Sequence, residues 1–362
     1  MTTAITRVTR AFPRHRARRA VPRWFALAAL LALVAAPVLT PAVGAAATGQ
    51  GVGVSAAYNS GQRIGVPAYF TPTSKDDFSP YDKKWDRLIG PRSARPVTAI
   101  NPQTLGMVVI NPQDKDALTP AQAKAERLAY IGLIARAQYE GITVLAYVHT
   151  QQGTRPWDDY KDQDTGLLKQ GVHSDLDDYL TPNADPTLTY NVNGIFLDQA
   201  SDETADLEYY RTIYSYIKAK GAAKKVVLNP GNYPEDQGYM AISDVIVACE
   251  NTYAGYVATC TPPAWAYSYP ANRFWHLVHT TASLTEMRKA VTLSKQRNAG
   301  WVYVTPDIEL TSNLECTKKG CTWVEAHVNP WDTLPAPTYW SAEREAVGGI
   351  VQGPACIPGW GC

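Results

Sequence analysis

The sequence lacks several features that would place it in a familiar functional class. Its formal net charge is only +1 over 362 residues. This argues against a nucleic-acid partner, because such partners usually require a strongly basic surface. No glycine-rich phosphate loop or Gly-x-Ser-x-Gly motif follows an expected strand, and no His-Glu-x-x-His motif occurs. The sequence therefore gives no support to nucleotide binding, to serine-hydrolase chemistry or to a zinc protease.

Phenylalanine is scarce among the aromatic residues. The chain has 6 Phe against 21 Tyr and 10 Trp. Tyr and Trp combine an apolar ring with a polar group, so they suit wet clefts and the faces of sugars. They also pack at the ends of structural elements, and the composition leaves both interpretations open.

Beyond the first 50 residues, no apolar run is long enough to predict a membrane-spanning helix. Near the start, five arginines between positions 14 and 23 precede an apolar run over 25–38, and small residues continue to Ala47. This order is typical of a secretory signal peptide. We predict a signal peptide over 1–47, a linker over 48–61 and a secreted protein, either released or associated with the cell wall. Arg18-Arg19 leaves twin-arginine export as the alternative, although Val21-Pro22 continues that motif poorly.

The cysteines all lie in the last third of the chain, and an even number in an exported protein indicates disulfides. Sequence proximity favours three pairs: Cys249–Cys260, Cys316–Cys321 and Cys356–Cys362. A zinc site is the weaker alternative, because no pair has Cys-x-x-Cys spacing. In addition, His276 and His279 are three residues apart on an expected strand and would point to opposite faces. No metal or cofactor is implied.

Short apolar runs alternate with helical patterns along the rest of the chain. The clearest helix follows Thr119, which with Gln122 forms a capping box, and it ends at Gly141. Further helices are expected near 82–89, 175–180, 203–220, 234–242, 284–298 and 339–347. Strands are expected at 65–70, 107–110, 143–148, 194–198, 226–228, 244–249, 274–279 and 301–304.

These strands read as continuous apolar runs, as parallel strands covered on both faces do. Eight strand–helix units predict a (β/α)8 TIM barrel over 62–350, followed by a short cysteine-containing tail over 351–362. An open doubly wound sheet is the alternative fold.

Polar residues stand where the expected strands end, and in a barrel these ends share one rim. They are Tyr69, Asn111, His149, Asp198, Asn229, Glu250, His279 and Thr305. Two of them, Asp198 and Glu250, are carboxylates, which suits glycoside hydrolysis. In that reaction one group protonates the leaving oxygen, and the other attacks or stabilises the oxocarbenium-like centre. The structural alternatives are that Asp198 caps the next helix and that Glu250 pairs with Arg273 or is oriented by the neighbouring Cys249–Cys260 loop.

Several neighbours of the two acids are candidate substrate-binding residues. They are Gln199, Tyr69, Asn111, His149, Asn229 and Trp275. A strand-end histidine such as His149 also often binds a loop carbonyl, and Tyr69 and Trp275 also suit packing in the core or at the rim.

Six ordered motifs together resemble the spherulin-4-like family. They lie at 65–70, 109–112, 144–150, 194–198, 228–231 and 329–335. The resemblance implies a secreted (β/α)8 glycoside hydrolase. Characterised relatives are endo-acting and cleave α-1,4-linked N-acetylgalactosamine in exopolysaccharides such as galactosaminogalactan. Their essential acids are an Asp-Glu pair after the fourth strand and a Glu after the sixth, which Asp198 and Glu250 match, but Gln199 replaces the second acid of the pair.

We therefore predict an endo-acting hydrolase of an amino-sugar exopolysaccharide, working as a monomer. Asp198 would be the nucleophile, or would orient an attacking acetamido group of the substrate, and Glu250 would be the general acid/base. Because an amide cannot ionise, Gln199 keeps open a non-catalytic carbohydrate-binding or cell-surface protein on the same barrel. A purely structural exported protein is the third possibility.

Overall fold

The computed structural model describes residues 61–72, 83–90, 104–112, 119–163, 165–308, 313–317, 320–324 and 329–348. The predicted signal peptide and C-terminal tail lie outside this part of the chain, and so do Cys356 and Cys362. Within it, no helix has the length and apolar character needed to cross a membrane.

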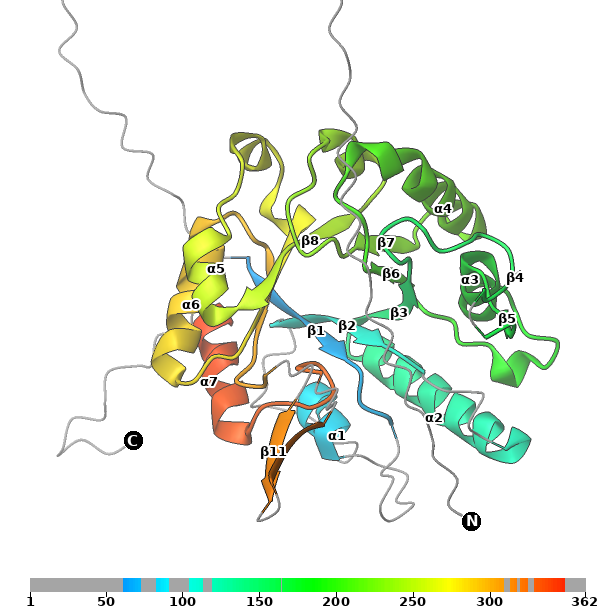
Figure 1. The fold of residues 1–362 in the computed structure, drawn as a ribbon, viewed down its shortest axis with the longest axis horizontal. Helices are drawn as coiled ribbons and strands as arrows, with labels where there is room; N and C mark the ends of the chain where they lie inside the picture. The colour runs from blue at the N-terminus through cyan, green and yellow to red at the C-terminus, as the bar shows by residue number, and fades with distance from the viewer. Residues whose placement is uncertain are drawn as a thin grey trace, which may run out of the picture. The chain divides into compact units, whose positions relative to one another are not determined.

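Eight parallel strands close into a barrel with helices outside it (Figure 1). Around the ring they are β1 (Arg63–Ala68), β2 (Leu105–Ile110), β3 (Thr143–His149), β6 (Gly194–Asp198), β7 (Lys225–Leu228), β8 (Val245–Thr252), β9 (Phe274–His279) and β10 (Trp301–Val304), which pairs with β1. The predicted (β/α)8 barrel is confirmed. Each expected strand is present, with ends displaced by at most three residues.

The helices follow the strands much as the sequence predicts. They are α1 (Lys83–Ile89), α2 (Pro120–Tyr139), α3 (Val172–Leu180), α4 (Leu207–Lys220), α5 (Tyr253–Thr259), α6 (Leu284–Gln296) and α7 (Pro337–Gly348). The capping box of α2 is formed: Thr119 Oγ1 accepts from the Gln122 N–H, and the Gln122 side chain accepts from the Thr119 N–H.

Some elements differ from the sequence prediction. The helix expected over 234–242 is a short 3-10 helix, Gln237–Ala241. Helix α5 and two hairpins are not predicted from the sequence: β4 (Tyr160–Lys161) with β5 (Leu168–Lys169), and β11 (Asn313–Thr317) with β12 (Gly320–Val324). Elements this short carry too few residues to show a periodic pattern.

The expected pair Cys249–Cys260 forms a disulfide. It closes a loop that runs from β8 through α5. Pairing of β8 with β9 is irregular between Val247 and Cys249, so the strand changes register just before Glu250. In the β11–β12 hairpin, Cys316 lies opposite Cys321 in the backbone register.

Large side chains fill the barrel interior. Trp275 is fully buried and meets Phe196 edge-to-face, with ring centroids 5.7 Å apart. Gly65 leaves room for this indole, because a Cβ there would lie 2.8 Å from a Trp275 ring atom. Strands with apolar residues toward both the interior and the helices explain the continuous apolar runs in the sequence.

Gly194 begins β6 at a point where no side chain fits, because an added Cβ would collide with the Lys225 backbone. We predict that Gly194→Ala lowers the free energy of unfolding by ~2–3 kcal/mol, as overpacking of a core does. The matched control is Gly132→Ala in α2, where an added Cβ meets nothing within 4 Å. This change should raise stability by ~0.5–1 kcal/mol through helix propensity. Urea unfolding of both variants checks the pair, and equal effects would contradict the close strand contact.

Candidate functional site

The side chain of Asn229 joins the two acids predicted from the sequence. Asn229 follows β7, which lies between β6 and β8 in the barrel. Its Nδ2 donates to Asp198 Oδ1 and to Glu250 Oε2, both at 2.6 Å. These two carboxylate oxygens therefore lie at most about 5.2 Å apart, twice that bond length.

The orientation of this amide is fixed by the turn after β7. Asn229 Oδ1 accepts from the Gly231 N–H at 3.1 Å, so Nδ2 is the atom that faces the acids. Gly231 has φ +69°, a conformation that glycine adopts without steric cost. The Asn229 backbone N–H donates to the Leu197 carbonyl of β6, and the side chain is buried. The Asn229 amide is thus fixed both by the turn after β7 and by strand β6.

Each acid accepts one further side-chain donor. The Tyr147 hydroxyl donates to Asp198 Oδ2 at 3.0 Å, and Trp331 Nε1–H donates to Glu250 Oε1 at 2.9 Å. Trp331 is anchored in turn, because its N–H donates to Asn329 Oδ1 and its carbonyl accepts from the Tyr69 N–H. The segment that contains Trp331, more than eighty positions after Glu250, therefore supplies an N–H donor to the Glu250 carboxylate.

Tyr147 and Trp331 belong to the site but are not among the site residues predicted from the sequence. A signal for Tyr147 was present, because it stands two residues before His149 on β3 and so shares its face. The rings of these two residues stack with centroids 6.5 Å apart. Trp331 belongs to the motif at 329–335, which carried the family resemblance, but no local pattern connects that motif to Glu250.

Burial dominates the electrostatics of Asp198. It raises the pKa of this carboxyl, while the donors on Asn229, Tyr147 and the Gln199 backbone oppose the rise. Burial and the nearby Asp198 carboxyl also raise the pKa of Tyr69 and Tyr147, so both phenols stay protonated. Tyr147 is thereby kept as a hydrogen-bond donor.

Of the other predicted rim residues, Tyr69 contacts Tyr147 at this site, whereas Asn111 and His149 stand at the ends of neighbouring strands. Tyr69 meets Tyr147 edge-to-face, with centroids 5.3 Å apart. Asn111 follows β2, is partly exposed and accepts the Tyr130 hydroxyl at its carbonyl. His149 ends β3, and burial followed by the neighbouring Arg155 lowers its pKa, which favours the neutral imidazole.

Trp275 does not belong with these residues. It is the second residue of β9, is 0% exposed and packs inside the barrel against Phe196. The expectation that it contacts a substrate is therefore corrected: Trp275 lies at the start of its strand, far from the rim end at His279, and its indole packs in the barrel interior, which is the packing alternative for this residue.

Gln199 stands directly after Asp198 with an exposed side chain and φ +49°. Positive φ is uncommon for a residue other than glycine. Its carbonyl accepts from the Gln152 N–H at 2.7 Å and from Thr150 Oγ1 at 2.9 Å. The loop after β3 thus fixes the backbone of Gln199.

The capping and ion-pair alternatives for the two acids do not match these contacts. Helix α4 begins at Leu207, and Asp198 bonds to Asn229 and Tyr147 rather than to the first turn of that helix. Arg273 donates to the carbonyls of Asp244, Met240 and Ser243. Both acids are instead directed toward a shared site at the rim.

Possible metal ligands gather at one place in the described residues, namely Cys249, Cys260 and His276. The two sulfur atoms are joined as a disulfide, so they are not available as thiolate ligands. Asp198 and Glu250 are not part of that group.

A family model described as "Spherulation-specific family 4" matches residues 63–318, well over half of the chain and including both acids. The chain belongs to this family. A relative in the spherulation-specific family 4 is Spherulin-4 of Physarum polycephalum, 31% identical over 206 residues, which cover 55% of this chain and 54% of the relative. The match thus spans about half the length of that relative.

Two solved structures are similar to this chain over part of its length. Sph3 of Aspergillus clavatus, crystallised with GalNAc, has a TM-score of 0.48 and 22% identity, covering 68% of this chain and 89% of that one. A glycoside hydrolase family 5 enzyme of Prevotella bryantii has a TM-score of 0.37 and 10% identity, covering 81% and 98%. At these values the likeness assigns neither activity nor substrate.

The contact from Tyr147 to Asp198 can be tested directly. We predict that Tyr147→Phe raises the pKa of Asp198 further, because the lost O–H donor stabilises the ionised carboxylate. A carboxyl carbon-13 NMR titration measures the shift. The control is Tyr209→Phe, whose hydroxyl donates to the Arg155 carbonyl instead. An unchanged titration in Tyr147→Phe, or an equal shift in the control, would contradict this arrangement.

Proposed function

We propose that this protein is a secreted, endo-acting glycoside hydrolase of an exopolysaccharide that contains N-acetylgalactosamine and galactosamine. Asp198 and Glu250 are its catalytic pair. Tyr69, Asn111, His149, Asn229 and Gln199 surround the substrate. The family to which the chain belongs, together with the motif resemblance, supports the amino-sugar polymer as the substrate class.

The observation that carries the proposal is the amide bridge. Asn229 holds two carboxyl groups on β6 and β8 at a defined separation at the rim of a closed barrel. Glycoside hydrolysis needs such a pair, with one group to protonate the leaving oxygen and one to act at the anomeric carbon. A sugar-binding site alone does not require two acids tied to one donor.

The separation favours retention of anomeric configuration. Retaining enzymes place their carboxyl groups about 5–5.5 Å apart, whereas inverting enzymes need about 6.5–9.5 Å to fit a water molecule. The limit of about 5.2 Å between the bridged oxygens agrees with the shorter class. Retention would proceed through a covalent glycosyl-enzyme intermediate or through attack by the substrate's own acetamido group.

The environments of the two acids favour a division of roles opposite to the one assigned from the sequence. Burial raises the pKa of Asp198, which suits the protonated group that donates to the leaving oxygen. Both acids accept a donor on each oxygen, from Asn229 and Tyr147 at Asp198 and from Asn229 and Trp331 at Glu250, so the raised pKa of Asp198 alone distinguishes them and leaves Glu250 as the proposed nucleophile.

The central experiment is cleavage of acetylated and partially deacetylated galactosamine polymers by the mature protein. We predict release of oligosaccharides, with kcat lowered at least ~1000-fold in Asp198→Asn and in Glu250→Gln. Glu235→Gln, an exposed acid in the loop after β7, is the matched control and should keep full activity. Proton NMR of the fresh reducing ends should show the configuration of the substrate. Cleavage that persists in both acid variants would refute the site, and an inverted product would refute the mechanism.

Gln199 has an exposed amide side chain at the position where the family resemblance implies an acid. This favours the second candidate function, a barrel that binds the polymer without cleaving it. The complete bridge between Asp198 and Glu250, which does not involve the Gln199 side chain, supports catalysis instead. Binding of the polymer by the native protein without any release of oligosaccharides would favour the second function.

We predict that Gln199→Glu changes kcat by no more than about threefold, because the existing pair already supplies an acid and a nucleophile. Initial rates on the same polymer measure this change, and Gln199→Ala serves as the control for loss of the amide. A gain beyond about tenfold in Gln199→Glu would mean that the native site is attenuated.

A further inference from the structure

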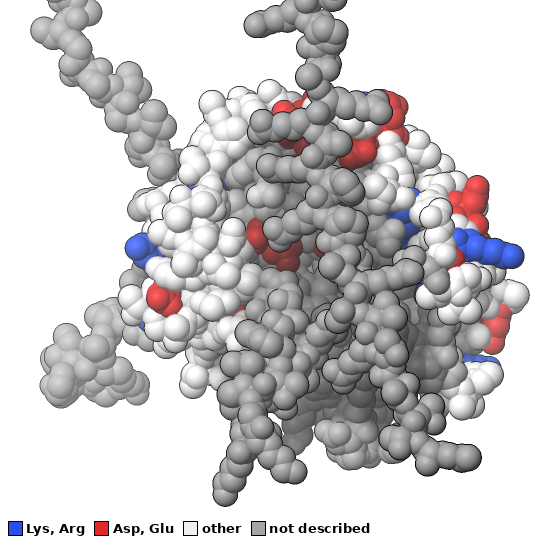
Figure 2. Space-filling model, in the orientation of Figure 1, with Lys and Arg blue, Asp and Glu red and all other residues white. Residues whose placement is uncertain are grey.

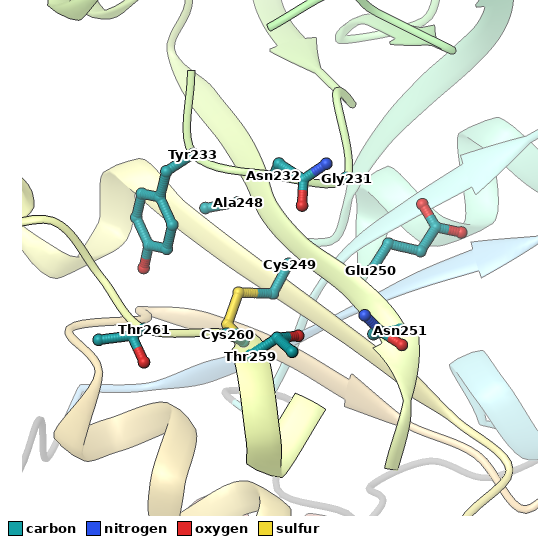
Figure 3. A pocket seen from close by; sticks show the side chains of 10 residues that line it. All are labelled: Gly231, Asn232, Tyr233, Ala248, Cys249, Glu250, Asn251, Thr259, Cys260 and Thr261. Atoms are coloured by element: carbon teal, nitrogen blue, oxygen red, sulfur yellow. A yellow bond between two sulfur atoms is a disulfide. The ribbon is translucent and has the colours of Figure 1, made fainter. Parts of the chain in front are cut away.

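The Glu250 carboxylate accepts two neutral N–H donors, one from Asn229 and one from Trp331. Figure 3 shows the Glu250 side chain on one face of the β8 ribbon and the Cys249–Cys260 disulfide on the other, as expected for successive residues of a strand. The disulfide therefore supports the strand rather than the carboxylate. On the face seen in Figure 2, acidic side chains lie in a hollow near the middle, whereas lysine and arginine stand at the margins. The direction of the two N–H donors thus contributes to where this carboxylate points.

The main chain around Trp331 is anchored to two other parts of the fold. The Trp331 carbonyl accepts from the Tyr69 N–H, just after β1, at 3.0 Å. Four residues further on, the Pro335 carbonyl accepts from the guanidinium of Arg87 on α1 at 2.9 Å. These bonds fix the backbone of the segment, but they do not fix the rotation of the indole about its side-chain bonds. The direction of the indole N–H therefore depends on the side chains that contact the ring.

Two aromatic side chains contact the Trp331 indole. The His279 ring meets it edge-to-face, with centroids 5.9 Å apart, and the Tyr303 ring lies tilted against it at 5.8 Å. Trp331 and His279 are each 5% exposed, and Tyr303 is 0% exposed. Little ring surface is therefore left on which a sugar could stack, and the three rings pack mainly against one another. Their arrangement suits the orientation of a neighbouring group rather than direct contact with a ligand.

The residue after His279 holds the imidazole in place. Thr280 Oγ1 forms a hydrogen bond with His279 Nδ1 at 3.0 Å. Thr280 has φ +57°, a left-handed conformation that is rare for a β-branched residue. Its N–H donates to the Asp307 carbonyl at 2.7 Å, which helps to hold this conformation. Strained backbone of this kind persists where surrounding contacts enforce it, and it concentrates at functional sites.

We infer that His279 is a positioning residue of the proposed reaction. Its imidazole, held by Thr280, directs the Trp331 indole N–H at the carboxylate of Glu250, the proposed nucleophile. The contacts involve three consecutive strands of the barrel, since β8 carries Glu250, β9 ends at His279 and β10 carries Tyr303. The role in catalysis rests on the proposed function, whereas the effect of His279 on the Trp331 indole does not.

Proton–nitrogen NMR of the indole N–H groups measures the effect on Trp331 directly. Trp331→Phe removes one indole peak and so assigns it, and the remaining indole peaks show whether each variant is folded. We expect His279→Ala to speed exchange of the Trp331 indole N–H with solvent at least ~10-fold, because its bond to Glu250 is no longer held. His279→Phe keeps a ring but loses the bond to Thr280, so its exchange rate should lie between those of the native protein and His279→Ala. An unchanged rate in His279→Ala, or an equal acceleration in both variants, would overturn the inference.

Substitution of Thr280 separates positioning from stability. Thr280→Gly removes the hydroxyl at a backbone conformation that glycine adopts freely, so the midpoint of urea unfolding should not fall. Indole exchange should nevertheless accelerate, and kcat on the galactosamine polymer should fall about fivefold with KM within about twofold of native. Asn191→Gly is the matched control, because Asn191 is also exposed with positive φ but precedes β6, at the opposite end of the barrel.

The control should keep the native exchange rate and the native kcat. Native values of both in Thr280→Gly would overturn the inference, as would an equal loss in Asn191→Gly. If the native protein cleaves no polymer, the proposed function fails, and the exchange rates still decide whether His279 and Thr280 hold the Trp331 indole.

Discussion

The candidate site depends on one side-chain amide that donates to two carboxylates. Without a shared donor, two ionised acids about 5 Å apart would repel by ~3 kcal/mol at an effective dielectric constant of about 20. Asn229 offers one N–H to each, and its oxygen is fixed by Gly231. The burial that raises the pKa of Asp198 acts in the same direction as this repulsion, since both favour one proton on the pair.

The barrel supplies the distances that this bridge requires. β6, β7 and β8 are consecutive in the ring, so the residues at their carboxyl ends meet without any long side chain having to reach across. The irregular pairing of β8 with β9 before Cys249 and the disulfide that follows adjust how Glu250 leaves the sheet.

Much of this arrangement could be predicted from the sequence. Continuous apolar runs and the capping box at Thr119 predict the strands and α2 correctly, and polar strand ends identify Asp198, Asn229 and Glu250 as neighbours at one rim. Contacts that depend on tertiary structure could not be read in this way. Trp331 reaches Glu250 only because its segment returns to β1, and Trp275 is buried because Gly65 makes space for it. No local sequence pattern indicates the contact of Trp331 with Glu250 or the burial of Trp275.

The return of the 329–335 segment also constrains when the site can form. A chain synthesised as far as β10 already contains all eight strands and both acids, but one oxygen of Glu250 still lacks the indole N–H that binds it in the finished fold. The Tyr69 N–H likewise lacks its acceptor, the Trp331 carbonyl, in such a chain. The strands of the barrel thus pair without this segment, whereas the complete environment of Glu250 also requires chain that follows β10.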